Sequence, residues 1–159
     1  MEFGQWEEWS ESRSIDWHLT NFPLHDGLRK LVQHLNWLYT TEPAFYDLDD
    51  SYEGYEWIDF HDGDNCVWSF VRKARNGDLL LLVVNATPVV RGGYRVGVPT
   101  SGWYKEILNT DAEIYGGSNV GNWGGKWAEP IEWQGRAHSI QIDLAPLSVN
   151  AFKYLKDVD

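Results

Sequence analysis

Side chains that could bind a metal ion gather in one short segment of the sequence. Asp59, His61, Asp62 and Asp64 lie close together there. The segment lacks the glycine and glutamate that an EF-hand places at fixed offsets. No two of the five histidines have the spacing of the His-Glu-x-x-His zinc motif. Because such polar clusters are typical of turns that end a strand, we expect no metal ion and no other cofactor.

The glycines at 116–121 give little support for a phosphate-binding loop. Gly116 and Gly121 have the spacing of such a loop, but Asn122 and Trp123 stand where a lysine and a hydroxyl residue are needed. Ser118 lacks the second glycine of a nucleophile elbow. We interpret this stretch as a long glycine-rich loop.

Nucleophilic and carboxylate chemistry find little support. Cys66 alternates with Trp68 and Phe70, which favours a small buried core residue over a nucleophile. Glycoside hydrolysis needs two carboxylates held at a defined separation, and no local pattern singles out such a pair. We therefore predict no catalytic residue in this chain.

Aromatic side chains offer a different chemistry. Trp123, Trp127 and Trp133 flank the glycine-rich loop, and sugar rings can stack on exposed indoles. Structural packing explains these three residues equally well. We keep them as candidate sugar-stacking residues beside that alternative.

The elements that must position these residues are one helix and a series of strands. Apolar residues at helical spacing predict a helix at about 22–40, begun by Pro23 and stopped by Pro43. Asn76-Gly77 predicts a tight hairpin turn. The apolar strand after it, Leu79–Val84, should be central and covered on both faces. The other predicted strands are 56–60, 66–71, 94–98, 103–108, 131–133, 139–144 and 148–154.

Short strands separated by turn residues predict an antiparallel β-sandwich. Trp57, Trp68 and Trp103 lie on strand patterns, so we expect them in its core. We place the division at about residue 45, with a loop and helix in 1–45 and the β-domain in 46–159.

Composition excludes several classes of protein. The 159 residues carry 13 Lys+Arg and 24 Asp+Glu, a net charge of −11, which disfavours binding to nucleic acid or to an anionic membrane. A single cysteine excludes an intrachain disulfide. The acidic start lacks the apolar segment of a secretory signal, so we expect a cytoplasmic protein.

Motifs along nearly the whole chain, in collinear order, resemble those of the 1,4-α-glucan (glycogen) branching enzymes. They include 2–5 (Glu-Phe-Gly-Gln), 35–39, 42–44, 55–59, 85–89, 94–99 and 108–118 (Leu-Asn-Thr-Asp-Ala-Glu-Ile-Tyr-Gly-Gly-Ser). No single motif is specific, but the set is. The resemblance implies the α-amylase superfamily, whose members join a central (β/α)8 barrel to a carboxy-terminal sandwich.

The resemblance implies that the parent protein cleaves an α-1,4 bond, holds the chain as a covalent glycosyl-enzyme and passes it to a 6-hydroxyl. The Asp nucleophile, the Glu acid/base and a second Asp lie in upstream barrel motifs, and no residue here matches them. This chain should therefore be inactive alone. Its partners would be an α-glucan and the missing catalytic barrel in cis.

The resemblance further implies a mainly β fold: an antiparallel Greek-key β-sandwich preceded by a loop and one α-helix left over from the barrel. Met1 directly precedes Glu2 where the family has two glycines, so we expect a carboxy-terminal piece. Since loops after barrel strands carry active sites, Gln5, Trp6 and Trp9 are candidate substrate-side residues. The alternatives are a stand-alone carbohydrate-binding sandwich and a purely structural domain.

Overall fold

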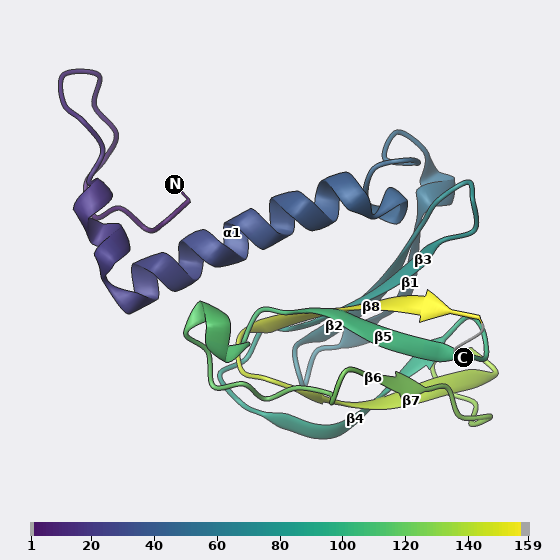
Figure 1. The fold of residues 1–159 in the computed structure, drawn as a ribbon. Coiled ribbons are helices and arrows are strands. Elements are labelled where there is room, and N and C mark those ends of the chain that lie inside the picture. Colours follow the sequence, from purple (N-terminus) through teal and green to yellow (C-terminus); the bar gives the residue numbers. More distant parts are fainter. Residues whose placement is uncertain (1, 157–159) are drawn as a thin grey trace.

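A computed structural model describes residues 2–156, which form one long helix and eight strands (Figure 1). Four short 3₁₀ helices are η1 (Trp17–Asn21), η2 (Pro43–Phe45), η3 (Tyr52–Gly54) and η4 (Glu113–Tyr115). The long helix is α1 (Pro23–Thr41). The strands are β1 (Tyr55–Asp62), β2 (Val67–Lys73), β3 (Leu79–Asn85), β4 (Arg91–Val98), β5 (Trp103–Asn109), β6 (Gly125–Trp127), β7 (His138–Leu144) and β8 (Ser148–Leu155).

The strands form two antiparallel sheets that face each other. One sheet has six strands in the order β1-β2-β3-β8-β5-β6, and the other pairs β4 with β7. Strand β8 lies between β3 and β5, so neighbours in space are often distant in sequence, as in Greek-key connections. The prediction of a mainly β antiparallel sandwich with one preceding helix is confirmed.

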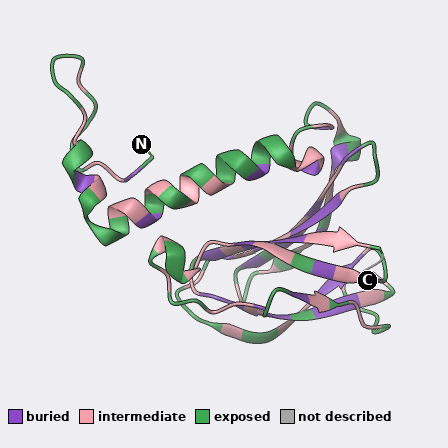
Figure 2. Ribbon diagram, in the orientation of Figure 1, coloured by how far each residue is buried: buried purple, intermediate pink, exposed green. Residues whose placement is uncertain are grey.

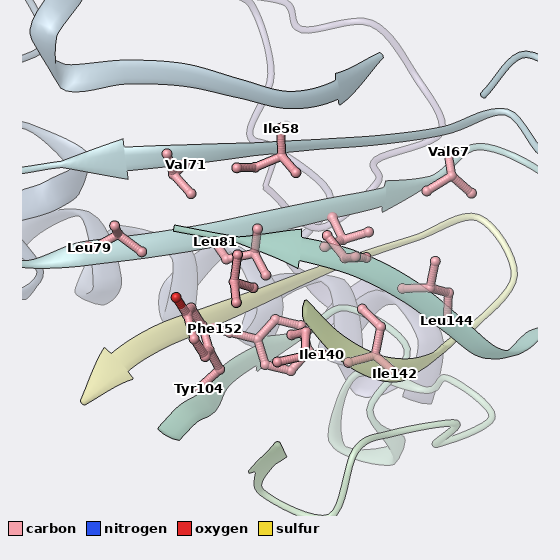
Figure 3. Packing of buried hydrophobic residues seen from close by; sticks show 13 residues of the cluster. Ile58, Val67, Val71, Leu79, Leu81, Tyr104, Ile140, Ile142, Leu144 and Phe152 are labelled. Atoms are coloured by element: carbon pink, nitrogen blue, oxygen red, sulfur yellow. The ribbon is translucent and has the colours of Figure 1, made fainter. Parts of the chain in front are cut away.

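The main core fills the space between the two sheets (Figure 3). In β2, Val67, Ser69 and Val71 are buried while the residues between them are at least partly exposed, which is the alternation of a strand with one face inward. The largest fully buried side chains of this core are Tyr104 and Phe152, from the neighbouring strands β5 and β8. Burial of these aromatic and aliphatic side chains holds the two sheets together.

Strand β3 is central and covered on both faces, as its apolar sequence predicts. Leu81 and Val83 belong to the main core, whereas Leu80 packs on the outer side with Ala44 of η2. The hairpin before β3 is also as expected, because Ala74 and Asp78 close the turn with a 2.9 Å hydrogen bond and Gly77 has φ +90°.

Helix α1 lies against the outer face of the six-stranded sheet near its carboxy-terminal end. Leu38 packs there with Leu108 and Ala151, and Glu42 accepts a 2.7 Å ion-pair hydrogen bond from Lys153. Much of the rest of the helix is exposed, and the loop before it projects away from the sandwich (Figures 1 and 2). The helix begins at Pro23, one residue later than predicted.

The predictions for residues 131–133 and for Cys66 are wrong. Residues 131–133 form no regular strand, because Trp133 pairs only with Arg136 in a tight turn. The last strand of the six-stranded sheet is instead β6, whose three residues are too few to show an alternation pattern. Cys66 is exposed rather than buried, since it precedes β2 in a turn with φ 49°.

The prediction that strand tryptophans form the core is wrong for Trp57 and Trp68, which are 44% and 39% exposed. Alternation identifies two faces but does not say which one is inward. Here Ile58, Val67 and Val71 take the inward positions, and the indoles lie on the outer face. Trp103 is half-buried, because its neighbour Tyr104 occupies the core position.

Candidate functional site

The predicted substrate-side residues lie in the projecting loop at the amino end. Gln5 acts there as a local support, because its side chain accepts a 3.0 Å hydrogen bond from the Asp16 backbone N–H and donates a 2.9 Å bond to the Glu7 carbonyl. Trp6 and Trp9 are 77% and 65% exposed. The loop therefore presents two indoles to solvent and uses Gln5 to hold its own shape.

This loop and α1 border an apolar groove of about 640 Å³. Phe3 and Trp17, whose rings stack at 5.6 Å, line it together with Trp9 and Val32. Leu24 and Leu35 of the helix are also exposed. An apolar patch of this kind is typical of a surface that packs against another part of a protein.

We expect backbone amides of residues 5–16 to exchange hydrogen for deuterium far faster than those of β3. The segment has no regular helix or strand, and its side chains are mostly exposed. Hydrogen-exchange mass spectrometry measures this directly. Protection of the Trp6–Trp9 peptide comparable to that of β3 would contradict the expectation.

The three tryptophans around the glycine-rich loop do not form one surface. Trp123 is 95% exposed and borders a groove of about 620 Å³ that also contains His34 and Tyr115. Trp127 lies against Trp103 with ring centroids 5.4 Å apart, across β5 and β6. Trp133 borders a separate groove beside β1 and β4. Each indole is accessible, but each belongs to a different place on the sandwich.

A continuous aromatic surface lies instead on the outer face of β1 and β2. Tyr55 stacks on Phe70 at 5.1 Å, and Trp57 meets both rings edge-on at 5.2 and 5.7 Å. Phe60 extends the row at 5.3 Å from Trp57 and is 50% exposed. We call Tyr55, Trp57, Phe60 and Phe70 the β1–β2 aromatic face.

Sequence reasoning missed this face. One signal that could have found it is Arg72, which shares a strand face with Phe70 and Trp68 and is of a type that cores seldom contain. A second feature is the bulge in the register between Trp57 and Asp59, which side-chain alternation alone does not reveal.

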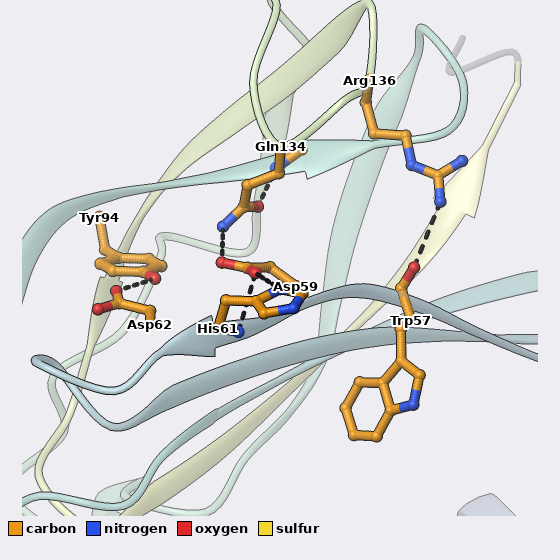
Figure 4. A network of polar contacts seen from close by, with 8 residues as sticks. Trp57, Asp59, His61, Asp62, Tyr94, Gln134 and Arg136 are labelled. Atoms are coloured by element: carbon orange, nitrogen blue, oxygen red, sulfur yellow. Dashed lines mark hydrogen bonds and ion pairs between the residues drawn. The ribbon is translucent and has the colours of Figure 1, made fainter.

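A polar network borders the aromatic face along the edge strand β1 (Figure 4). Gln134 donates a 2.9 Å hydrogen bond to Asp59, and Tyr94 donates a 2.6 Å bond to Asp62. Partial burial raises the pKa of Asp62, but the hydrogen bonds from Tyr94 and Asn65 outweigh it and hold that pKa below its ordinary value. Burial and the adjacent Asp62 carboxylate raise the pKa of Tyr94, so it stays a neutral donor at pH 7.

Glu56, also on β1, forms ion pairs with both Lys73 and Arg136. Hydrogen bonds from these two cations lower the pKa of the Glu56 carboxyl. A carboxyl whose pKa is lower in the folded than in the unfolded chain stabilises the fold above its unfolded pKa. That stabilisation is lost as the pH falls through the folded value.

Glu56→Gln should therefore lower the free energy of unfolding by about 1 kcal/mol at pH 7, the upper range for accessible ion pairs. The difference from the unmodified chain should shrink as the pH falls from the ordinary glutamate pKa, about 4.3, toward the lower pKa that Glu56 has in the folded chain. Urea unfolding at a series of pH values measures it. Glu132→Gln, at an exposed position, is the control, and an equal loss for both variants would contradict the assignment.

The described part of the chain contains neither a cluster of metal-binding side chains nor a membrane-spanning helix. Within residues 2–156, no three His, Cys, Asp or Glu side chains gather closely enough to hold a metal ion. In the same range, no helix is long and apolar enough to cross a membrane.

The β-domain of this chain matches a known protein family. Residues 57–154, from β1 to β8, match the family described as "Alpha amylase, C-terminal all-beta domain". The chain belongs to this family. The match contains both sheets and most of the β1–β2 aromatic face, whereas α1 and the loop before it lie outside the matched range.

Relatives of this alpha-amylase C-terminal domain are found in longer proteins. The chain is 50% identical over 154 residues to the 1,4-alpha-glucan branching enzyme GlgB of Aquifex aeolicus, covering 96% of this chain and 24% of that protein. It is 44% identical over 160 residues to GlgB of Synechocystis, covering 100% of this chain and 21% of that protein. The chain thus spans about a fifth to a quarter of the length of these relatives.

Solved structures show the same fold at low sequence identity. The catalytic module of the glycogen-degrading pneumococcal virulence factor SpuA, in complex with an inhibitor, aligns with a TM-score of 0.57 at 17% identity, covering 91% of this chain and 20% of that one. The Group B Streptococcus pullulanase SAP aligns with a TM-score of 0.57 at 18% identity, covering 89% of this chain and 18% of that one. The fold of this chain therefore recurs in these two proteins at low sequence identity.

Proposed function

We propose that this chain is the carboxy-terminal part of a 1,4-α-glucan branching enzyme. Residues 1–45 would be the last loop and helix of its catalytic barrel, and residues 46–159 its carboxy-terminal sandwich. The observation that carries the proposal is the identity of 44% and 50% to two GlgB proteins over nearly the whole chain, including the loop and helix outside the family match.

The exposed apolar surface of the first 45 residues supports this division. Trp17, Leu24 and Leu35 are 60%, 71% and 40% exposed. Exposed apolar side chains of this kind are typical of a face that another part of a protein covers. A barrel would cover the exposed side of α1, while the sandwich contacts the helix through the buried Leu38 end and through Gly27 and His34, which pack on Tyr115.

The reaction itself would take place in the barrel. There a retaining pair of carboxylates would break the α-1,4 bond and pass the chain to a 6-hydroxyl, and this chain supplies none of those residues. The cytoplasm is the proposed location, and the α-glucan chain is the proposed ligand.

The role of the sandwich in this proposal is to hold glucan near the barrel. Sugar rings have apolar C–H faces that pack on aromatic rings, and the β1–β2 aromatic face offers Trp57 and Phe60 to solvent. His61, whose ring lies 4.0 Å from that of Phe60, is available to meet sugar hydroxyls. Exposed shallow surfaces bind weakly, so the isolated chain should have low affinity.

Affinity electrophoresis in gels containing glycogen tests this role. The isolated chain should be retarded slightly, and Trp57→Ala should remove most of that retardation, with Trp37→Ala on α1 as a matched exposed control. Strong retardation would instead favour the alternative of a stand-alone carbohydrate-binding module. The coding sequence upstream of residue 1 tests the parent directly, since it should encode a barrel with the two Asp and one Glu of the family.

A further inference from the structure

The groove that Trp133 borders lies at the edge of the sandwich between β1, the start of β4 and the turn from Trp133 to Arg136. Its volume is about 830 Å³, within the range of about 300–1,000 Å³ typical of small-molecule sites. Asp59 and Asp62 line one side, Arg91 and Tyr94 another, and Trp133 forms part of its border. This groove is distinct from the β1–β2 aromatic face, because the Trp57 indole points away from the Asp59–Gln134 pair (Figure 4).

The backbone that carries Trp133 is held in place, although the residue is 47% exposed. Trp133 and Arg136 exchange two backbone hydrogen bonds of 3.0 and 2.9 Å, and both residues between them have positive φ, as in a two-residue hairpin turn. The Gln134 side chain accepts from the Gly97 N–H at 2.9 Å and donates to Asp59 at 2.9 Å. A ring on a fixed turn loses little conformational entropy when a ligand packs on it.

The groove also contains a guanidinium group with unused donors. Arg91 donates one long hydrogen bond of 3.4 Å from its terminal nitrogen Nη2 to the Asn65 carbonyl; its Nε is buried, so the terminal nitrogens are the donors that a ligand in the groove would meet. A guanidinium has five N–H donors in a planar fork. Such a fork can donate to two neighbouring oxygens at once.

The charge of the groove indicates a neutral ligand rather than an anion. The carboxylates of Asp59 and Asp62 and the guanidinium groups of Arg91 and Arg95 line the groove together, so their charges balance, whereas the chain as a whole carries a charge of −11. An anionic ligand would meet repulsion from the chain as a whole. A neutral polyol with an apolar face fits the indole and the guanidinium donors.

We infer that this groove binds glucosyl residues of an α-1,4-linked glucan, with one sugar ring stacked on Trp133 and vicinal hydroxyls hydrogen-bonded to Arg91. The inference rests on the proposed function for the identity of the sugar, while the stacking and hydroxyl contacts come from the groove itself. The groove would be a second glucan contact of the sandwich, on the other side of the edge strand β1 from Trp57.

Titration of the chain with maltoheptaose, followed by NMR of the tryptophan indole N–H groups, tests the inference. The indole signal that is absent from Trp133→Ala identifies this residue, and it should shift saturably with added maltoheptaose. Calorimetric titration in a Trp57→Ala background measures the groove without the other proposed glucan contact: there Trp133→Ala should weaken maltoheptaose binding about tenfold, whereas Trp133→Tyr, which keeps a stacking ring, should stay within about threefold. Trp37→Ala is the control for loss of an exposed indole elsewhere.

Arg91→Met gives an independent variant that keeps much of the volume of the side chain but removes its donors. The affinity for maltoheptaose, read from the Trp133 indole signal, should fall about tenfold in this variant. Thermal unfolding of each variant identifies any loss of fold. A Trp133 signal that does not move at saturating maltoheptaose, or equal affinity of the Trp57→Ala chain with and without a folded Trp133→Ala substitution, would overturn the inference.

The experiments distinguish failure of the groove inference from failure of the proposed function. If Trp57→Ala abolishes glycogen retardation while the Trp133 signal stays unmoved, the groove inference fails and the proposed function stands. If the Trp133 titration saturates but the parent protein makes no α-1,6 branches, the groove binds glucan and the proposed function fails.

Discussion

Truncating Phe152 to alanine should lower the free energy of unfolding by about 3–5 kcal/mol, the usual cost of removing a large aromatic side chain from a core. Phe152 is fully buried between the sheets in the main core cluster (Figure 3). Since domains of this size are stable by only about 5–15 kcal/mol, the variant should lose a large part of its total stability.

Urea unfolding followed by circular dichroism measures this loss. Phe22→Ala is the matched control, because the Phe22 side chain is exposed just before α1. The control variant should lose less than about 1 kcal/mol, as is usual for a surface substitution. Equal losses for the two variants would contradict the placement of Phe152 in the core.

Asn122→Ala should lower the free energy of unfolding by about 2–3 kcal/mol, although asparagine is a polar residue in a glycine-rich loop. Its fully buried side chain donates to Glu106 at 2.9 Å and accepts from the Asp143 backbone N–H at 2.8 Å. The alanine variant would leave the Asp143 N–H without this acceptor and Glu106 without one of its donors, and unsatisfied buried groups are costly.

The control for this variant is Asn36→Ala on the exposed face of α1. Alanine is the better helix former, so this change should leave stability unchanged or raise it slightly. The two variants are compared by thermal unfolding. If Asn122→Ala costs no more stability than an ordinary surface substitution, the loop is not anchored to β5 and β7 through this side chain.

The regular elements were predictable because their signals are local. Helix α1 begins at Pro23 within one residue of the expected start, since proline at the first turn and leucine at helical spacing do not depend on distant contacts. Strand β3 was recognisable as central because both of its faces are apolar. Turn residues at Asn76-Gly77 predicted the hairpin for the same reason.

The inward face of the outer strands was not predictable, because it depends on partners that are distant in sequence. In β1 both Trp57 and Ile58 are apolar, and Ile58 is the one that joins the core with residues of β4 and β7. The larger Trp57 packs on Phe70 of β2 at the surface. Strand β6 was missed because three residues are too few to show a period.

The candidate site was predictable only in part. Trp133 was selected from its position near the glycine-rich loop, but its groove contains Asp62 and Arg91, which come from strands far away in the sequence. The turn that holds Trp133 depends on Gln134 reaching Gly97 and Asp59. Such contacts arise from the fold and carry no local sequence pattern.

A branching assay on two proteins tests the central claim most directly: this chain alone, and the same chain preceded by the polypeptide encoded upstream of it. We predict that the longer protein forms α-1,6 branches on amylose and that the chain alone forms none, because the chain lacks the catalytic carboxylates. Branch formation by the chain alone, or its absence from the folded longer protein, would contradict the account.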